Sequence, residues 1–348
     1  MLERFAYLNA GTFGPLPRPV AEAVSGRLRL DLELGRSGPR YLDWVLEARE
    51  RVRTRVAATI GVEPAHVALT RATTDGCNIV VAGLGLGQDD EVVTTDAEHF
   101  GLVGALGASR ARIRVARVGE RAGERALEAI LAEVGPRTRL IALSHVLWTT
   151  GNAIPVGEVK ERTGLPLLVD GAQAVGAIPV DARPFDFYTV SGQKWLCGPD
   201  ATGALYVADP DSLSVAFPSY FSQQGFEPDG RYTPTPGAAR FDDGWLASGM
   251  LAGLEAALDF HPDWCFERAA EMARRCRERL AERVDLVTAP DQATLVTWRA
   301  AGAPEEVAAG AYERGVVIRD LPGTEFLRAS CGYWTSDEDV ERLVDALG

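Results

Sequence analysis

The sequence predicts an α/β protein with two domains, and three features of the 348-residue chain lead to this prediction. Short apolar segments alternate with segments of helical periodicity in the first two thirds of the chain, which is typical of a mainly parallel sheet between helices. A segment rich in Pro, Gly, Asp and Tyr follows at 208–244, and a loop of this length usually has a function. The remaining third mixes helices with short strands, which predicts a smaller α+β domain. We expect a large domain over 17–250 and a small domain made of 1–16 and 251–348.

The elements of the large domain are expected in a regular order. Two amphipathic helices begin it at 18–35 and 40–61, and in the second Leu42, Val45 and Val52 recur near helical spacing. Short apolar runs predict strands at 66–70, 91–95, 111–118, 138–144, 166–170, 185–191 and 203–207. Helices are expected between them at 75–83, 100–109, 124–134 and 157–163. Beyond the long loop we expect helices at 246–260, 264–283 and 336–347, and strands at 293–299, 315–320 and 326–330 around another helix. This order predicts a sheet of the seven-stranded type with helices on both faces.

The composition excludes several classes of partner. The formal net charge of −13 argues against nucleic acid and anionic membranes, because both require a basic face. No apolar run approaches the roughly 18–20 residues of a membrane span, and the segment MLERFAYLNAG lacks the features of a signal peptide. The cysteines are odd in number and form no CxxC pair: Cys77, Cys197, Cys265, Cys276 and Cys331. We therefore expect a cytoplasmic protein without a disulfide framework or a zinc site.

The chain contains only two lysines, Lys160 and Lys194, although Lys and Arg together number 36. An arginine supplies charge but cannot be deprotonated in a protein, so it cannot act as a nucleophilic amine, whereas a lysine can. Lys160 lies in the helical segment GEVKERTG and is expected on the surface. Lys194 lies in SGQKWLCGP, just after the strand expected at 185–191. Lys194 is therefore the candidate nucleophile.

Other polar residues lie where strands are expected to end, which is where open parallel sheets bind ligands. Asp170 ends one strand and suits a positively charged ring nitrogen, and Gln173 can reach the same ligand. Thr73 and Thr74 lie at a strand-to-helix turn, where free N–H groups favour phosphate. His99 lies just past another strand, where its imidazole can stack on a flat ring.

This set of groups matches the requirements of pyridoxal 5′-phosphate: a Schiff-base lysine, an acidic group for the ring nitrogen, a phosphate site and a stacking partner. Burial and a cationic ring are expected to lower the pKa of Lys194, so that part of the amine is neutral. Each motif alone also has an ordinary interpretation. Asp170 can cap the following helix, and His99 can be a packed or an exposed histidine. The order of the motifs along the chain favours the cofactor.

With these motifs the chain resembles the class V aminotransferase family of fold-type I pyridoxal phosphate enzymes, which includes cysteine desulfurases, isopenicillin N epimerases and cyst(e)ine C–S lyases. The resemblance runs from YLNAGTFGPLP to RASCGYWTSDEDV, and the C–S lyase branch is most similar, through TTDGCNIVVAGL, DAEHFG, LSHVLWTTG, LVDGAQAVGAIPVD and SGQKWLCGP. It implies that Lys194 forms the Schiff base, that Asp170 holds the pyridine nitrogen, and that Gln173 contacts the ring oxygen. It also implies that His99 stacks on the ring. The residues it implies around the phosphate are Thr73, Thr74, Ser191 and Gln193. The family usually forms homodimers with both active sites at the subunit interface.

Arg319 and Arg328 are candidates for binding the substrate. They lie on two short strands joined by a turn, and C–S lyases show a similar pair that binds the substrate α-carboxylate. A guanidinium can bind a carboxylate through two hydrogen bonds, each contributing about 1.5–3 kcal/mol when charged. A surface salt bridge is nearly as good an interpretation for Arg319.

Three features depart from the usual pattern of the family. Desulfurases have a nucleophilic cysteine in the loop that corresponds to RDLPGTE, which contains none, and Cys331 after the strand is expected to be a packed thiol. Gln193 replaces a histidine that many relatives have before the lysine. Trp245 replaces a threonine that often contacts the phosphate of the partner subunit, and it is expected either to lose that contact or to wall the substrate pocket.

The lack of a cysteine nucleophile favours a reaction that needs only the cofactor and a base. The first hypothesis is β-elimination from cystine, a cysteine S-conjugate or a cysteine sulfoxide, with the Lys194 amine as base and with pyruvate, ammonia and a thiol or persulfide as products. The second is transamination or amino-acid epimerisation, with desulfuration as a further alternative. The third, a non-catalytic binding or scaffold protein, would need no Schiff-base lysine. Tyr220, Tyr232 and Arg240 in the long loop are further candidate contacts of the substrate.

Overall fold

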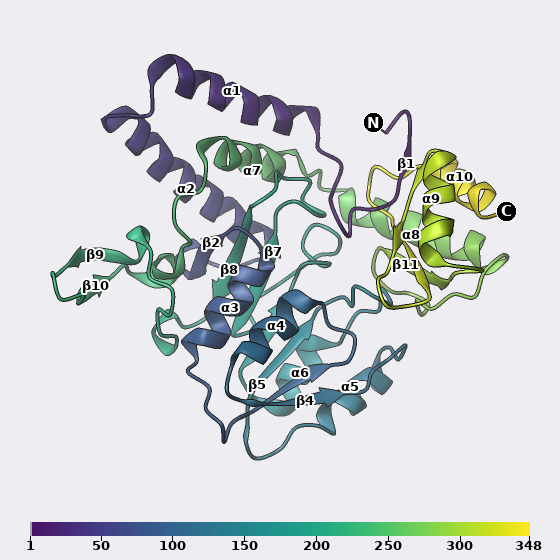
Figure 1. The fold of residues 1–348 in the computed structure, drawn as a ribbon, viewed down its shortest axis with the longest axis horizontal. Helices are drawn as coiled ribbons and strands as arrows, with labels where there is room; N and C mark the ends of the chain where they lie inside the picture. The colour runs from purple at the N-terminus through teal and green to yellow at the C-terminus, as the bar shows by residue number, and fades with distance from the viewer. Residues whose placement is uncertain (1) are drawn as a thin grey trace.

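The computed structural model describes residues 2–348, and its centre is a seven-stranded sheet with helices on both faces (Figure 1). The strand order is β2-β8-β7-β6-β5-β3-β4. The neighbours from β7 to β4 are parallel, whereas β8 runs antiparallel to both β2 and β7. The predicted α/β fold with a mainly parallel sheet is therefore confirmed. Its strands are β2 (Val67–Thr70), β3 (Glu91–Thr95), β4 (Arg112–Ala116), β5 (Thr138–Ser144), β6 (Leu167–Asp170), β7 (Phe187–Ser191) and β8 (Gly203–Val207).

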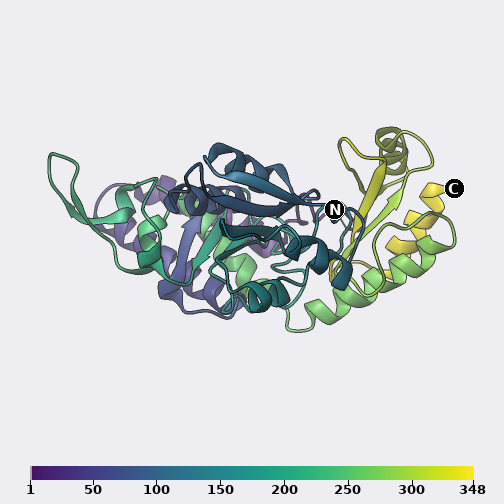
Figure 2. The same cartoon turned by 90° about the horizontal axis from the view of Figure 1, so that it is seen from below.

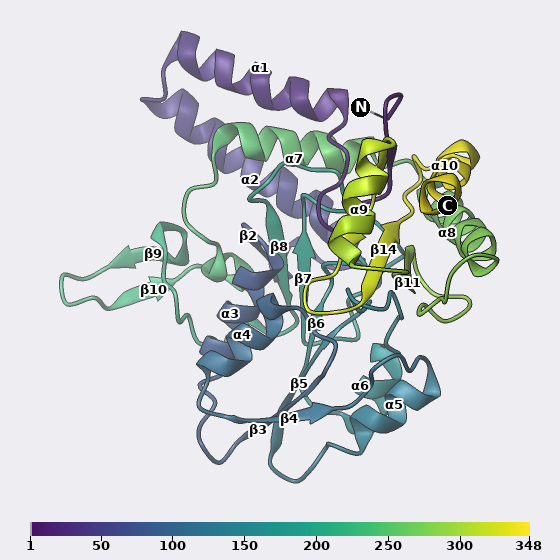
Figure 3. The ribbon, with the colours of Figure 1, turned by 45° about the vertical axis from the view of Figure 1, so that its right-hand side comes forward.

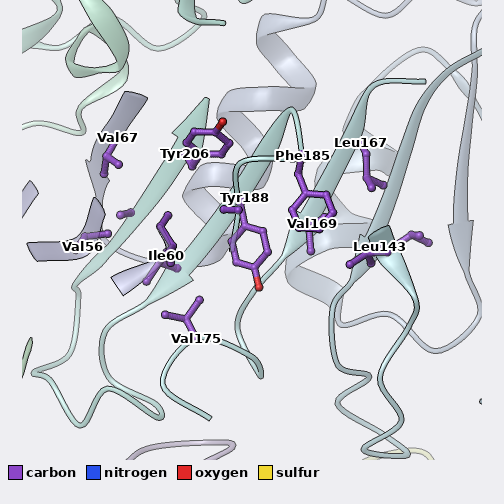
Figure 4. Close-up of a cluster of buried hydrophobic side chains, with 14 of the residues drawn as sticks. Val56, Ile60, Val67, Leu143, Leu167, Val169, Val175, Phe185, Tyr188 and Tyr206 are labelled. Carbon is purple, nitrogen blue, oxygen red and sulfur yellow. The ribbon is translucent and has the colours of Figure 1, made fainter. Parts of the chain in front are cut away.

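A hydrophobic core lies on each face of this sheet, because successive side chains of a strand point to opposite faces. Leu69 belongs to the core on one face and its neighbour Ala68 to the core on the other. Residues of α2, α5, α6 and α7 cover the first face, and Figure 4 shows part of this core around Tyr188 and Phe185. Residues of α3 and α4 cover the second face. The helices are α1 (Arg18–Leu34), α2 (Pro39–Thr59), α3 (Thr73–Gly83), α4 (Phe100–Ala108), α5 (Glu124–Leu131), α6 (Val156–Thr163) and α7 (Ser248–Phe260), and α1 packs on α7 (Figure 3).

A smaller α+β group of elements has its own core and lies at one end of the molecule (Figure 2). Its sheet has the order β11-β14-β13, and the N-terminal strand β1 pairs in parallel with β12 through Ala6 and Val316. The elements are β1 (Ala6–Tyr7), α8 (Cys265–Ala281), β11 (Leu295–Arg299), α9 (Pro304–Glu313), β12 (Val316–Val317), β13 (Arg319–Asp320), β14 (Phe326–Ser330) and α10 (Asp337–Leu347). The predicted boundary after residue 250 falls inside α7, where Leu251 and Leu254 join the core of the large sheet. The division into domains stays a prediction.

The segment expected as a loop at 208–244 contains a short antiparallel hairpin that projects from the molecule (Figure 1). The hairpin strands are β9 (Gln223–Phe226) and β10 (Tyr232–Pro234). Short 3-10 helices occur at Pro64–His66, Pro210–Ser212, Tyr220–Ser222 and Gly237–Phe241. Sequence reasoning missed the hairpin because its residues show no alternation of apolar and polar side chains. The C-terminal end of the segment is held by Asp242, whose buried carboxylate contacts the guanidinium groups of Arg49 (2.7 Å) and Arg53 (2.8 Å).

The described residues 2–348 contain no helix that is both long enough and apolar enough to span a membrane. All five cysteines are buried and none forms a disulfide. Cys331 is a packed thiol in the core of the smaller group, as expected.

Candidate active site

A cavity of about 260 Å³ lies between the C-terminal ends of the large-sheet strands and strands β13 and β14. Ligands of open parallel sheets bind at this edge. The predicted site residues that line the cavity are Thr73, Thr74, His99, Gln173, Ser191, Gln193, Lys194, Arg319 and Arg328. Asp170, the remaining predicted residue, is buried at the end of β6. The fold therefore brings together residues from six separate segments of the chain.

Thr73 and Thr74 form the first turn of α3, just beyond the end of β2. Ala72 precedes the helix in an extended conformation and its side chain makes no capping bond, so the first N–H groups of the helix are available to an anion. The helix can lie this close to the sheet because residue 76 is glycine. A Cβ at Gly76 would lie 2.8 Å from the Cγ2 atom of Thr189. The turn has the geometry of a phosphate site.

Only one of the two carboxylate oxygens of Asp170 accepts hydrogen bonds from residues 2–348. Its Oδ1 accepts hydrogen bonds from the Ala172 N–H (2.9 Å) and the Thr189 hydroxyl (3.2 Å), and no residue in 2–348 is seen to donate to Oδ2. Gln173 is fixed nearby, because its Nε2 donates to the Gly11 carbonyl (2.8 Å) and its Oε1 accepts from the Trp195 indole (3.0 Å). Asp170 therefore keeps one oxygen for a ligand cation, and Gln173 keeps one amide proton.

Lys194 follows β7 in a loop that the N-terminal segment covers. The Gly14 N–H donates to the Gln193 carbonyl (2.8 Å), and the Ser191 hydroxyl donates to the Gln193 side-chain oxygen (2.8 Å), which leaves the amide group of Gln193 free to donate. Burial lowers the pKa of Lys194 to about 8, against the opposing charge of Asp170. Part of the amine is therefore neutral near neutral pH, as a nucleophile or base requires.

The proton on His99 can be placed from its hydrogen bond. The Gly101 N–H donates to Nδ1 of His99 (3.1 Å), so Nδ1 carries no proton and the neutral ring is protonated on Nε2. Burial, followed by the charge of Lys194, lowers the pKa of His99, which keeps the ring neutral at neutral pH. The ring meets the Trp148 indole edge to face, with centroids 5.3 Å apart. His99 is thus a hydrogen-bond donor toward a ligand.

Arg328 presents to the cavity a buried charge that pairs with no acidic side chain within residues 2–348. It is 2% exposed, its Nη1 donates to the Trp148 carbonyl (2.7 Å), and its Nε has no partner among residues 2–348. Gly11 permits this packing, since a Cβ there would lie 2.6 Å from Nη2 of Arg328. Arg319 lies opposite in the β13–β14 register, and its side chain is 40% exposed with Asp320 3.9 Å away. Burial, and secondarily Arg319, lower the pKa of Arg328 to about 9, so the group stays charged at neutral pH. A buried charge is costly without a counter-charge, so this pair favours an anionic ligand group.

Sequence reasoning missed five further residues of the cavity wall: Gly11, Thr12, Ala72, Trp148 and Leu321. Trp148 lies shortly after the C-terminal end of β5, at the same edge of the sheet as Asp170 at the end of β6. Its position after a strand could therefore have identified it as a candidate site residue. The indole Nε1 of Trp148 is buried without a partner among the described residues. The N-terminal segment has no local signal, because partners distant in sequence hold it at the site: β12 pairs with β1, and Gln173 and Gln193 bond to Gly11 and Gly14.

The wall of this cavity, as residues 2–348 of one chain form it, does not include Trp245, Tyr220, Tyr232 or Arg240. Trp245 is 53% exposed and stacks on Tyr220, with ring centroids 6.0 Å apart. Arg240 pairs instead with Asp211 at 2.8 Å. Trp245 therefore does not wall the pocket within its own chain.

Comparisons with known proteins agree with this arrangement. The family described as Aminotransferase class-V matches residues 7–301. Isopenicillin N epimerase from Streptomyces clavuligerus is 32% identical over 381 aligned positions, covering 98% of this chain and 93% of the relative. A cysteine desulfurase from Enterobacter sp. (strain 638) is 30% identical, covering 98% and 92% of the two chains.

Solved structures are similar over the full length. The cystine C–S lyase C-DES, in complex with its reaction product cysteine persulfide, has a TM-score of 0.92 at 27% identity, covering 99% of this chain and 98% of the other. A lysine-to-alanine mutant of C-DES with glycine covalently linked to the PLP cofactor has a TM-score of 0.91 at 26% identity, covering 99% and 97% of the two chains.

Proposed function

Since this chain belongs to the class V aminotransferase family, it is a pyridoxal 5′-phosphate enzyme, and we propose that it cleaves a carbon–sulfur bond by β-elimination. The proposed substrate is cystine, a cysteine S-conjugate or a cysteine sulfoxide. The products are pyruvate, ammonia and the released sulfur compound, which is a persulfide from cystine, a thiol from an S-conjugate and a sulfenic acid from a sulfoxide. The observation that carries this proposal is the full-length likeness to a cystine C–S lyase whose reaction product is cysteine persulfide.

The state of the cysteines supports elimination over desulfuration. Transfer of sulfur to the protein requires a thiolate, and no cysteine within residues 2–348 lines the cavity. A hydrogen bond with the Cys276 side chain, together with burial, raises the pKa of the Cys331 thiol well above its usual value. Burial raises the pKa of Cys197 to about 12. Both thiols are therefore protonated at neutral pH.

The polar groups of the cavity fit the charges of the cofactor. The free N–H groups of the α3 turn suit its phosphate, and the free Oδ2 of Asp170 suits its protonated ring nitrogen. The residues that would hold it are Thr73, Thr74, Ser191 and Gln193 at the phosphate, Asp170 and Gln173 at the ring edge, His99 against the ring, and Lys194 as the attachment point. When bound, the cofactor withdraws electrons from the substrate Cα and makes its proton acidic.

The residues of the chain have two further roles, which are substrate binding and proton transfer. Arg328, assisted by Arg319, binds the α-carboxylate and so orients the amino acid. The Lys194 amine, partly neutral because burial lowers its pKa to about 8, takes the proton from Cα. His99 cannot share this role easily, because the Gly101 N–H occupies Nδ1 and Nε2 already carries a proton.

The two arginines should contribute unequally to substrate binding. Arg328→Gln is expected to lower kcat/KM by about 10- to 150-fold, mainly through KM, since a charged hydrogen bond contributes about 1.5–3 kcal/mol. Arg319→Gln is the matched control, and a smaller loss is expected because its side chain is 40% exposed. Steady-state kinetics of both variants test this ranking, and an equal or larger loss in Arg319→Gln would contradict it.

Epimerisation is the second candidate function, and the 32% identity to an isopenicillin N epimerase favours it. An epimerase must return the proton to the opposite face of Cα, which requires a second proton donor. His99 carries a proton on Nε2 and lines the cavity, so it is the residue to test for that role. Transamination begins with the same proton removal by Lys194.

One assay separates these reactions. The cofactor-loaded protein is incubated with L-cystine and with a cysteine S-conjugate, and pyruvate, alanine, sulfane sulfur and the D-amino acid are measured together. Pyruvate with persulfide is the expected result, and Lys194→Ala provides the blank. Alanine with sulfane sulfur would indicate desulfuration instead. Accumulation of the D-isomer without pyruvate would assign the epimerase function.

The proposal includes a homodimer with active sites at the subunit interface and a cytoplasmic location. The large apolar side chains exposed along α1 support the dimer, with Leu28 at 51%, Leu32 at 86% and Leu34 at 66% exposure. Light scattering during size-exclusion chromatography measures the mass of the assembly directly.

A further inference from the structure

Glu98 lies next to His99 and has no role in the reaction described above. Its carboxyl group points into the protein, where Oε1 accepts a hydrogen bond from the Thr95 hydroxyl (2.8 Å). Its Oε2 accepts from the Ser144 N–H (3.0 Å) and the Ser144 hydroxyl (2.5 Å). One side chain therefore joins the C-terminal ends of β3 and β5, immediately before His99, the proposed contact of the cofactor ring.

The same carboxyl group is connected to Asp170. Ser144 is the register partner of Asp170 in the parallel pair of β5 and β6, and the His145 N–H donates to the Asp170 carbonyl (3.0 Å). Glu98 thus fixes one strand end that carries His99 and another that adjoins Asp170. These two residues are the proposed contacts of the ring face and the ring nitrogen.

Two buried titratable groups face Glu98 from other elements, Asp170 on β6 and Cys77 on α3. Burial raises the pKa of Glu98 to about 7, against the hydrogen bonds from Ser144 and Thr95, and the charge of Asp170 raises it further. Burial, with Asp170 and Glu98, raises the pKa of the Cys77 thiol, so that it is neutral. The negative charge of Asp170 therefore acts on Glu98, and a cation that pairs with Asp170 would offset that charge.

We propose that Glu98 is a positioning residue for His99 and Asp170, and that it releases a proton when the cofactor binds. A cationic ring nitrogen beside Asp170 offsets the negative charge that favours the protonated form of Glu98, so the ionised form becomes more stable. The ionised carboxylate then accepts three charge-assisted hydrogen bonds, which strengthens the link between the two strand ends. This inference rests on the cofactor and not on the elimination reaction.

Glu98→Gln separates the two parts of the proposal. Its amide oxygen can accept from Ser144 and its amide nitrogen can donate to the Thr95 hydroxyl, so the contacts remain while the ionisable proton is lost. Glu98→Ala removes the contacts as well. Glu91→Gln is the matched control, because Glu91 is a buried carboxylate at the other end of β3, where it pairs with Arg137 at 2.7 Å.

The experiment measures binding of pyridoxal 5′-phosphate to the cofactor-free full chain by calorimetry, in buffers of different ionisation enthalpy. Near pH 7 the wild type should release up to about half a proton per chain more than Glu98→Gln, because a group with a pKa of about 7 is about half protonated there. The affinity of the wild type relative to Glu98→Gln should rise with pH between about pH 6 and pH 8. Glu91→Gln should behave as the wild type in both measurements.

The positioning role has its own readout, the dissociation constant of the cofactor. Glu98→Ala should bind it about 10-fold or more weakly than the wild type, while Glu98→Gln at about pH 6 should bind it as the wild type does. An equal proton count in the wild type and Glu98→Gln would overturn the proton release. Unchanged affinity in Glu98→Ala would overturn the positioning role. No turnover is measured, so a failure of the proposed elimination reaction leaves both results interpretable.

Discussion

Lys194→Ala should lower the rate of the reaction by about 10⁴-fold or more, because the substitution removes the residue that we propose as both the attachment point of the cofactor and the base. The loss should appear in kcat, since Arg319 and Arg328, the proposed contacts of the substrate carboxylate, remain in place. Product formation under saturating substrate and cofactor measures the effect. Residual activity within about 10-fold of the wild type would remove Lys194 from its role.

The sequence offers an unusually clean control for this variant, because the only other lysine is Lys160. Lys160 pairs with Asp186 at 2.6 Å, away from the cavity, so Lys160→Arg should keep full activity. Borohydride reduction in the presence of pyridoxal 5′-phosphate, followed by peptide mass analysis, should label Lys194 and not Lys160. Labelling should become faster as pH rises and level off above about pH 8, where the Lys194 amine is neutral. The same rate across that range would contradict the lowered pKa.

Asp242→Ala should lower the free energy of unfolding by about 3–5 kcal/mol, the largest effect on stability that we expect. The substitution leaves Arg49 and Arg53 as buried charges without a counter-charge. It also removes the acceptor of the Leu69 N–H, which donates to Oδ1 of Asp242 at 2.7 Å. Denaturant unfolding at equilibrium, read as a shift of the midpoint, measures the loss.

Asp211→Ala is the matched control for this prediction. Asp211 also pairs with an arginine, Arg240, but its side chain is 84% exposed, and exposed pairs contribute less than about 1 kcal/mol. A loss at Asp242 no larger than that at Asp211 would show that the buried network contributes no more than a surface pair.

The parts of the fold that could be predicted are those that local sequence determines. The strands that end at Asp170 and Ser191 are short apolar runs between turn residues, and their positions followed from that pattern. Because parallel strands end at one edge, their polar residues met in one cavity. Lys194 and His99 line this cavity, as their positions near strand ends predicted, and so do the two arginines. The roles of all four residues stay predictions until the variants are measured.

The parts that could not be predicted depend on partners that are distant in sequence. β1 is two residues long and forms only because Val316 and Val317 lie beside it. Trp148 lines the cavity from a loop after β5, and its carbonyl accepts a hydrogen bond (2.7 Å) from Arg328, which is 180 residues away in sequence. The ionisation of Glu98 depends on burial and on Asp170, neither of which the segment DAEHFG reveals.

The N-terminal segment that covers the Lys194 loop has a consequence for how the protein is made. Its anchors are Val317, whose carbonyl accepts from the Leu8 N–H at 2.9 Å, and Ser330, whose N–H donates to the Leu8 carbonyl at 2.8 Å. A growing chain therefore exposes residues 6–14 long before their partners are made, and it cannot place them until residue 330 has left the ribosome. Contacts of such long sequence separation slow folding and leave apolar surface exposed to aggregation in the meantime. We expect refolding from denaturant to restore helical circular dichroism well before it restores the cavity.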